Sequence, residues 1–381
     1  MNVVKMQVVT KQIRGVSYKP TDLHDSLNSS SVILLRANNI DDGKINFDDV
    51  VYVDKSKVSK DQYLKKGDIL ICASSGSKQL VGKAASFDFD KECTFGAFCK
   101  VVRPDENVAD YIGKYFQSVK YRSIISNVAI GANINNIRNE HIDSLELPMY
   151  STEKANDIVH LLSKVQSIIE YRKQELSNLD DLIKARFVEL FGHPDNNEKG
   201  WKMNTFGDIC TVRQGLQIPI SKRLTEYEED CYEYITVQYL HGGKAREYIK
   251  NPKPTVICTK DDILMTRTGN TGMIVTGVDG VFHNNFFLID FDRSKYDKEF
   301  LVQYLNLDII QADILRRAGT STIPDLNHGE FYKIKVFEPP IVLQREFNRF
   351  LEQVDKSKVA VQKALDKTQL LFDSLMQKYF G

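Results

Sequence analysis

The feature that most constrains the fold of this 381-residue chain is an internal repeat of about half its length. A shift of 189 residues places Phe191-Gly192 on Phe380-Gly381 and Leu162 on Leu351, and the shift grows to 200 toward the N-terminus, as loop insertions would make it. Two copies of a repeat this long indicate two tandem modules and not a solenoid. The predicted boundaries are residues 1–150 (module 1), 151–192 (first long helix), 193–340 (module 2) and 341–381 (second long helix).

Both long helices carry apolar residues in alternating steps of four and three, the period of a coiled-coil seam. Arg172 interrupts the first series and Lys358 interrupts the second, and each aligns with an apolar residue of the other helix. Polar residues at seam positions set the register of a coiled coil and its choice of partner. Pairing of the two helices is the simplest way to bury both series, and a homodimeric coiled coil is the alternative. The predicted seam residues are Leu162, Val165, Ile169, Leu176, Leu179, Ile183, Leu351, Val354, Val361, Leu365, Phe372 and Leu375.

The residue patterns of both modules predict strands as well as helices, so the predicted fold class is α+β. Each module has strands first, then a helix, a glycine-containing loop and the long helix. The predicted strands are Ser31–Leu35, Asp68–Ala73, Glu233–Val237, Asp262–Met265 and Phe286–Phe291, and the predicted helices are Ala109–Ile125 and Phe300–Leu315.

Charge and hydropathy exclude several classes of protein. The 51 Lys and Arg balance 51 Asp and Glu, which excludes a wholly basic surface but leaves room for a segregated DNA-binding surface. No apolar run approaches the roughly 20 residues of a membrane span, and Met1–Thr10 lacks a signal-peptide pattern. We therefore expect a cytoplasmic protein with no membrane partner, whose six cysteines are reduced.

Catalytic motifs are absent or spoiled. The segment Gly76–Ala84 resembles a phosphate-binding loop, but Ala84 stands where a Ser or Thr ligand of magnesium is required. The segment Asn251–Pro254 begins like an amino-methyltransferase loop and lacks the aromatic residue. The histidines show no metal-ligand spacing. We predict no catalytic residues, no metal and no cofactor, with an enzyme built from unmarked residues as the alternative.

Three polar segments recur at equivalent places in both modules, each after a predicted strand. Their Arg, Asn and Gln side chains suit base edges in a DNA groove, and their Ser and Thr suit phosphate oxygens. Any one of them alone is typical of an ordinary solvated turn, and their recurrence favours a binding surface. In the predicted matching, segment 74–78 corresponds to segment 267–271. The candidate DNA-binding residues are Arg14, Ser17, Tyr18, Lys19, Arg36, Asn38, Ser75, Ser77, Lys78, Gln214, Gln217, Gln238, Tyr239, Arg267, Thr268 and Asn270.

Over essentially its whole length the chain resembles the specificity subunits of type I restriction-modification systems. The resemblance depends on the order, spacing and duplication of short strings, and not on any one of them. They include Ile13–Tyr18, Leu35–Ile40, Gly67–Leu70 and Asp262–Gly269. The N-terminal segment of module 1, Met1–Ile13, is poorly similar to the start of module 2. The sequence therefore does not show whether module 1 begins with the same strand.

The resemblance implies a non-catalytic subunit in which each module is a target recognition domain for one half of an asymmetric, bipartite site on double-stranded DNA. It implies that the long helices pair antiparallel and fix the distance between the half-sites. They would also dock two modification (methyltransferase) subunits and, through them, the restriction (motor-nuclease) subunits. The alternatives are a coiled-coil scaffold that does not bind DNA and, with no methyl-donor motif to support it, a complete restriction-methylation enzyme.

Overall fold

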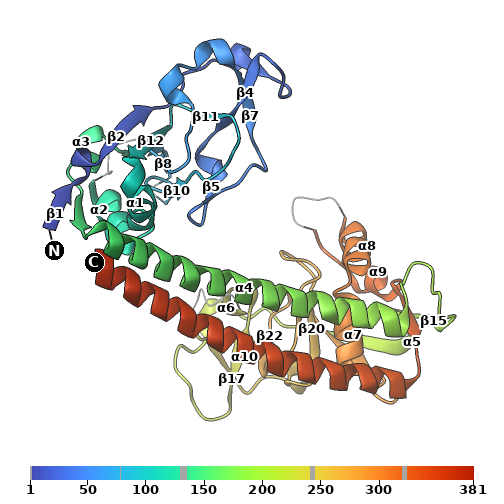
Figure 1. The fold of residues 1–381 in the computed structure, drawn as a ribbon. Coiled ribbons are helices and arrows are strands. Elements are labelled where there is room, and N and C mark those ends of the chain that lie inside the picture. The colour runs from blue at the N-terminus through green and yellow to red at the C-terminus, as the bar shows by residue number, and fades with distance from the viewer. Residues whose placement is uncertain (1, 78, 129–134, 241–244, 320–323) are drawn as a thin grey trace. The chain divides into compact units, whose positions relative to one another are not determined.

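The computed structural model describes residues 2–77, 79–128, 135–240, 245–319 and 324–381. The fold is α+β, as predicted, with two mixed-sheet domains that are each followed by a long helix (Figure 1). The chain divides into two compact units. Unit 1 comprises Met1–Gln174 and Gln362–Gly381, and unit 2 comprises Glu175–Val361, so each unit holds one module and a part of both long helices.

Unit 1 is built on two four-stranded sheets and three short strand pairs. The first sheet is antiparallel, in the order β10 (Ala84–Ser86), β8 (Ile69–Cys72), β12 (Cys99–Pro104) and β2 (Thr10–Arg14). The second is mixed, in the order β11 (Cys93–Phe95), β4 (Ser31–Leu35), β7 (Val51–Asp54) and β3 (Leu23–His24). The pairs are β1 (Asn2–Lys5) with β14 (Glu146–Met149), β5 (Ile40–Asp41) with β6 (Lys44–Ile45), and β9 (Ser74–Ser75) with β13 (Asn135–Asn136).

Strand β8 shows why this sheet forms. Ile69 and Ile71 pack on the helical side with Tyr111 and Tyr115, whereas Leu70 and Cys72 pack in the core that the second sheet closes. Because both faces of the strand are buried, the sequence here is a continuous apolar run. The helices of this unit are α1 (Ala109–Tyr115), α2 (Val119–Val128) and α3 (Asn139–Asp143).

Unit 2 repeats this plan. Its antiparallel sheet has the order β16 (Cys210–Gln214), β23 (Phe286–Phe291), β20 (Ile263–Thr266) and β21 (Ile274–Val275). Its mixed sheet has the order β18 (Tyr248–Lys250), β17 (Cys231–Ile235), β22 (Gly280–Phe282) and β19 (Ile257–Cys258), and β15 (Lys202–Thr205) pairs with β24 (Lys335–Glu338). The short helices are α5 (Phe206–Ile209), α6 (Val237–Leu240), α7 (Lys298–Leu305), α8 (Asp308–Ala318) and α9 (His328–Tyr332).

The duplication is therefore visible in the strand order: β10-β8-β12-β2 in unit 1 corresponds to β21-β20-β23-β16 in unit 2. The mixed sheets differ at both edges: β3 is added beside β7 in unit 1, whereas β19 is added in unit 2 beside β22, the counterpart of β11. Strand β1, which the sequence left open, pairs with β14 as β15 pairs with β24, so the divergent lead of module 1 still forms its first strand.

Two sequence expectations about helices were wrong in the same way. The expected helix Ala109–Ile125 is interrupted between α1 and α2, where the Ser118 hydroxyl accepts the Tyr121 N–H at 3.1 Å and begins a new helix. The expected helix Phe300–Leu315 is likewise divided into α7 and α8. Apolar periodicity continues through each break and therefore does not reveal it.

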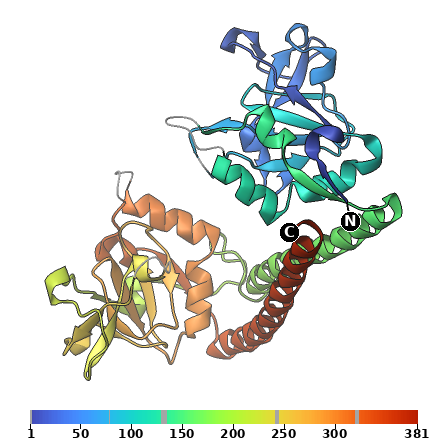
Figure 2. The same ribbon diagram turned by 90° about the vertical axis from the view of Figure 1, so that its left-hand side faces the viewer.

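The long helices are α4 (Thr152–Phe191) and α10 (Ile341–Phe380), and within each unit their segments lie side by side (Figures 1 and 2). In unit 2, Arg186 pairs with Glu346 at 2.9 Å and Asp180 pairs with Lys358, so the segments run antiparallel. Among the predicted seam residues, Leu162, Val165, Ile169, Ile183, Leu351, Val354 and Val361 are buried and Leu176, Leu179, Leu365, Phe372 and Leu375 are half-buried. Over the described residues, no helix is both long and apolar enough to cross a membrane.

Candidate nucleic-acid interface

The three polar segments of module 1 meet at one concave surface, which we call the module 1 hollow. It has a volume of about 620 Å³. The predicted residues Ser17, Tyr18, Arg36, Asn38 and Ser75 line it, together with the turn at residues 96–99. Segments that are distant in the sequence therefore supply one candidate surface.

Glycine makes the close packing behind this surface possible. A Cβ on Gly15 would overlap the carbonyl group of Gly96, and the next residue, Val16, donates its N–H to the Phe95 carbonyl at 2.8 Å. Gly215 is its counterpart, because a Cβ there would overlap the carbonyl oxygen of His283. These glycines match at the shift of 200 because both modules need the same close backbone approach.

The side chains of the second segment are tied to one acidic residue. Arg36 Nη2 donates to a carboxylate oxygen of Asp49 at 3.0 Å, and Asn38 Nδ2 donates to the same oxygen at 2.8 Å. The Nε of Arg36 is buried and has no acceptor among the described residues. The exposed Asp49 carboxylate thus orders both side chains at the edge of the module 1 hollow.

Phe98 is the most conspicuous residue that the sequence prediction missed. It lies on the turn of the module 1 hollow, and the residue is 72% exposed. Its carbonyl oxygen accepts the N–H groups of Ala73 and Ser74 at 2.9 and 3.0 Å, which fixes the turn. An exposed aromatic side chain on this fixed turn, which lines the same hollow as Arg36 and Asn38, suits apolar contact with a base. A lone Phe between a predicted strand and a predicted helix gives no sequence signal for this.

Equivalent backbone hydrogen bonds identify the corresponding positions of module 2. Arg267 N–H donates to the Asn285 carbonyl at 2.7 Å, as Ala73 N–H does to the Phe98 carbonyl. The Arg267 carbonyl accepts the Leu326 N–H at 2.9 Å, as the Ala73 carbonyl accepts the Ile137 N–H. Arg267 therefore corresponds to Ala73, which corrects the predicted matching of the third segment by one residue.

Three positions of this shared frame carry different side chains. They are Ala73 and Arg267, Phe98 and Asn285, and Asn136 and Asp325. In module 2, Arg267 forms a two-point ion pair with Asp325, whose side chain is 46% exposed. Asn285 and Asp325, like Phe98, were missed because their roles depend on pairing between distant segments.

The other predicted DNA-binding residues lie in several places. Tyr239 donates its hydroxyl to Glu233 and lines a separate concave surface of about 720 Å³ with Arg246. Thr268 forms a backbone bridge with Asp325. Lys78 lies outside the described residues. The exposed predicted residues are Arg14, Lys19, Ser77, Gln214, Gln217, Gln238 and Asn270.

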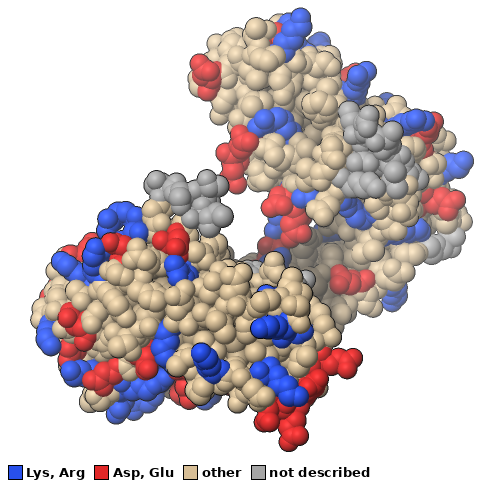
Figure 3. All heavy atoms as spheres, turned by 180° about the vertical axis from the view of Figure 1, so that it is seen from behind, with Lys and Arg blue, Asp and Glu red and all other residues tan. Residues whose placement is uncertain are grey.

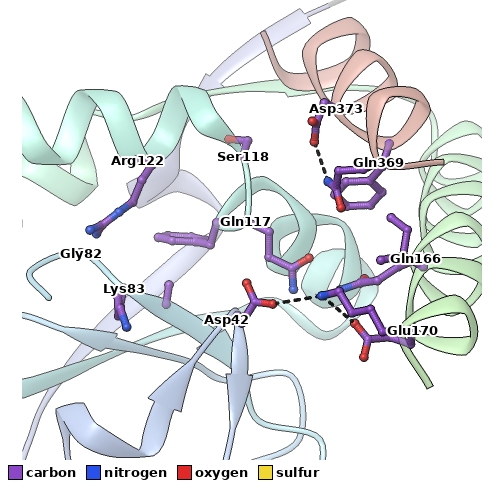
Figure 4. A pocket seen from close by; sticks show the side chains of 16 residues that line it. Asp42, Gly82, Lys83, Gln117, Ser118, Arg122, Gln166, Glu170, Gln369 and Asp373 are labelled. Atoms are coloured by element: carbon purple, nitrogen blue, oxygen red, sulfur yellow. Dashed lines mark hydrogen bonds and ion pairs between the residues drawn. The ribbon is translucent and has the colours of Figure 1, made fainter. Parts of the chain in front are cut away.

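A second concave surface of unit 1, of about 390 Å³, lies where module 1 meets the helices (Figure 4). Lys173 of α4 pairs with Asp42 at 3.6 Å and with Glu170 at 3.8 Å, and Glu170 also pairs with Lys44 at 2.8 Å. None of the predicted site residues except the seam residues Ile169 and Phe372 lies here. The surface joins module 1 to the helices through charge pairs.

Charged and titratable groups lie on and around these surfaces. Figure 3 shows Lys and Arg interspersed with Asp and Glu over the face that it displays. Burial raises the pKa of the Cys99 thiol, beside the module 1 hollow, to about 12, so this thiol stays protonated. Burial, and then the Arg267 cation, lower the pKa of His328 below its usual value. Among the described residues, no group of three or more His, Cys, Asp or Glu is arranged to hold a metal ion.

Comparison with known proteins assigns the family. The model of the "Type I restriction modification DNA specificity domain" matches residues 26–180 and 198–369, one match for each half of the chain. The chain belongs to this family. It is the DNA specificity subunit of a type I restriction-modification system, a non-catalytic part of that enzyme.

Two specificity-subunit relatives are similar over nearly their whole length. The chain is 28% identical to the type I restriction enzyme StySPI specificity subunit of Salmonella potsdam, over 98% of this chain and 87% of that protein. It is 27% identical to the EcoKI specificity subunit of Escherichia coli (strain K12), over 99% of this chain and 88% of that protein.

Solved structures share the fold. The specificity subunit from M. genitalium matches with a TM-score of 0.58 at 16% identity, over 100% of this chain and 96% of that chain. A chain from a structure that addresses complex assembly and conformational transition of the type I system matches with a TM-score of 0.61 at 15% identity, over 100% of this chain and 97% of that chain.

Proposed function

We propose that each module of this specificity subunit is a target recognition domain that reads one half of an asymmetric, bipartite site on double-stranded DNA. The observation that carries this proposal is the shared frame with different side chains. Module 1 has the buried Ala73 and the exposed Phe98 and Asn136 where module 2 has Arg267, Asn285 and Asp325. Domains with one frame and different exposed side chains bind different sequences, so the half-sites differ.

The division of labour follows the segments of the chain. Residues 1–150 and 193–340 are the two recognition domains, and residues 151–192 and 341–381 are the helical parts that hold them. In module 1, recognition centres on the module 1 hollow with Arg36, Asn38 and Phe98. In module 2 it centres on Arg267 and the adjoining Thr268, and Gln238 belongs to the segment that corresponds to that of Arg36 and Asn38.

The long helices are the docking surface for two modification subunits, which connect the chain to the restriction subunits. Exposed apolar side chains on α4 and α10 support this, because apolar groups on a solvent face indicate contact with a partner. In unit 1 they include Leu161, Ile168, Tyr171, Leu370 and Leu371, and in unit 2 Leu182, Val342 and Val359. The balanced charge of the chain fits a subunit whose partners supply much of the phosphate contact.

Methylation mapping of variants in the assembled complex tests the proposal. Arg36→Ala is expected to relax or weaken recognition of one half-site and Arg267→Ala that of the other, by about 5- to 100-fold each. Lys202→Ala is the control, because this exposed lysine lies on β15, in a different sheet.

Equal loss at both half-sites from either variant would contradict the modular assignment. The scaffold alternative predicts that the chain together with its modification subunits shifts no DNA at any salt concentration. A specificity subunit predicts a shift that weakens steeply as salt rises.

A further inference from the structure

Arg267 of module 2 has a guanidinium that the protein holds rigidly but does not use completely. Its Nε and Nη2 donate to the two carboxylate oxygens of Asp325 at 3.0 and 2.8 Å. These nitrogens form the side-on face of the guanidinium. The end-on face, formed by Nη1 and the second hydrogen of Nη2, has no acceptor among the residues that the structure describes.

The backbone of Arg267 is fixed as firmly as its side chain. Its N–H donates to Asn285, and its carbonyl accepts the Leu326 N–H at 2.9 Å and the Thr271 hydroxyl at 3.1 Å. The side chain is only 19% exposed. An arginine held in this way loses little conformational entropy when its end-on face binds a ligand.

Two other arginines show what a purely structural role looks like in this fold. Arg103 makes the same side-on pair with Asp68, but its Nη1 and Nη2 also donate to the carbonyl oxygens of Asp61 and Tyr63. Arg223 donates from all three nitrogens, to the Ile218 carbonyl and to Glu247. Both of these guanidiniums donate to the protein from all three nitrogens, whereas Arg267 donates only from Nε and Nη2 among the described residues.

Asp325 is also unlike a structural partner in its exposure. Its side chain is 46% exposed, whereas that of Asp68 is 1% exposed. An exposed carboxylate on a DNA-binding surface repels phosphate, so attraction to DNA does not explain its position. The position of the Asp325 carboxylate is explained if it orients the Arg267 guanidinium.

We propose that Asp325 is a positioning residue that holds Arg267 so that its end-on face binds O6 and N7 of one guanine in the half-site read by module 2. This inference rests on the proposed function. The chemistry is the two-point arginine–guanine contact of the major groove. A phosphate fits the same fork but carries no sequence information, so a phosphate contact is the competing outcome of the test.

The test uses the complete complex with its modification subunits. Methylation kcat/KM is measured on the cognate duplex and on duplexes in which 7-deazaguanine replaces each guanine in turn, because this base lacks the N7 acceptor. We expect one guanine, in the module 2 half-site, at which the wild type loses about 10- to 100-fold. Asp325→Asn should lose most of this discrimination while nonspecific DNA binding stays equal or tightens.

Matched variants isolate the positioning role. Asp290→Asn removes the same charge from an exposed site on β23 and should behave as wild type. Asp325→Glu keeps a carboxylate and should restore part of the discrimination. Arg267→Lys keeps the positive charge without the fork and should lose it. Circular dichroism of each variant verifies that the fold is intact.

The outcomes separate this inference from the proposed function. If Arg267→Ala alters only one half-site and Asp325→Asn keeps full discrimination, the positioning role is wrong and the modular assignment stands. The positioning role is equally wrong if no guanine in that half-site responds, or if all positions weaken uniformly as a phosphate contact predicts. If Arg267→Ala weakens both half-sites equally, the proposed function itself fails.

Discussion

The two modules share their backbone frame but differ in what they present on it. The glycines Gly15 and Gly215, the sheet order and the hydrogen bonds around Ala73 and Arg267 are common to both. The exposed side chains are not: module 1 has an aromatic residue in a hollow, and module 2 has an arginine held by a carboxylate. If the proposed function is right, fold and specificity are carried by different residues, and each can change without the other.

The modules also differ in a structural ion pair. In module 1, Arg103 binds Asp68 through two bonds of 2.7 and 2.6 Å, and Asp68 is buried. In module 2 the equivalent acid, Asp262, pairs at 3.5 Å with Arg293, which is exposed and lies beyond the end of β23. The strand register places Asp290, and not an arginine, at the position of Arg103. The same sequence feature, an acid before a buried strand, thus stabilises the two modules to different extents.

The largest effect is expected where the frame is common to both modules. Gly15→Ala places a Cβ on the Gly96 carbonyl and should lower the free energy of unfolding of module 1 by about 3 kcal/mol or more, and Gly215→Ala should do the same to module 2. Hydrogen exchange of the full chain assigns each loss to its module. Gly76→Ala is the control, because no atom of the described residues lies within 4 Å of the position of its Cβ. A loss confined to one of the two glycine variants would break the claim of a shared frame.

The next effect separates the modules. Asp68→Ala leaves Arg103 half-buried without its partner and should destabilise module 1 by about 3 kcal/mol. Asp262→Ala loses an exposed pair and the turn bonds to Thr259, so about 1–2 kcal/mol is expected in module 2. Thermal unfolding combined with limited proteolysis measures both. Equal losses would show that the difference in burial has no energetic consequence.

A smaller effect is expected in recognition, without any change in stability. Phe98→Ala should weaken recognition of the module 1 half-site about 10-fold, or about 1.4 kcal/mol, because an exposed apolar contact with a base is removed. The free energy of unfolding should change by less than about 0.5 kcal/mol. Relative methylation rates on duplexes altered in one half-site measure the effect. A loss at the module 2 half-site would contradict the assignment.

The smallest effect concerns the junction of module 1 with the helices. Lys173→Gln removes two exposed ion pairs, to Asp42 and Glu170, and should lower the free energy of unfolding of unit 1 by less than about 1 kcal/mol. The difference from wild type should vanish in high salt. In the 189-residue repeat, Val359 is equivalent to Glu170 and Gln362 is equivalent to Lys173, so the second long helix lacks these charges. A loss of stability that persists in high salt would show that Lys173 stabilises unit 1 through packing and not through its charge.

Much of the architecture could be predicted from the sequence, because it depends on local periodicity and on repetition. The 3.5-residue series of the long helices, the apolar run of β8 and the duplication all reflect burial patterns written along the chain. The helix breaks before Ser118 and at Asn306 could not be predicted, because local capping ends a helix without ending its apolar pattern. The residue-level matching of the third segment was off by one for a similar reason: loop composition does not report hydrogen-bond register.

The candidate interface, like the fold, could be predicted from the sequence only in part. Residue types alone show that polar segments recur after equivalent strands, because strand ends and the duplicated pattern can be recognised in the sequence. The folded structure is needed to show that Ser17, Arg36 and Ser75 share one hollow, that Phe98 is exposed beside them, and that Asp325 binds Arg267. These relations join residues far apart in the chain, and their geometry is set by strand pairing and by the close backbone approach at Gly15 and Gly215, which no local pattern encodes.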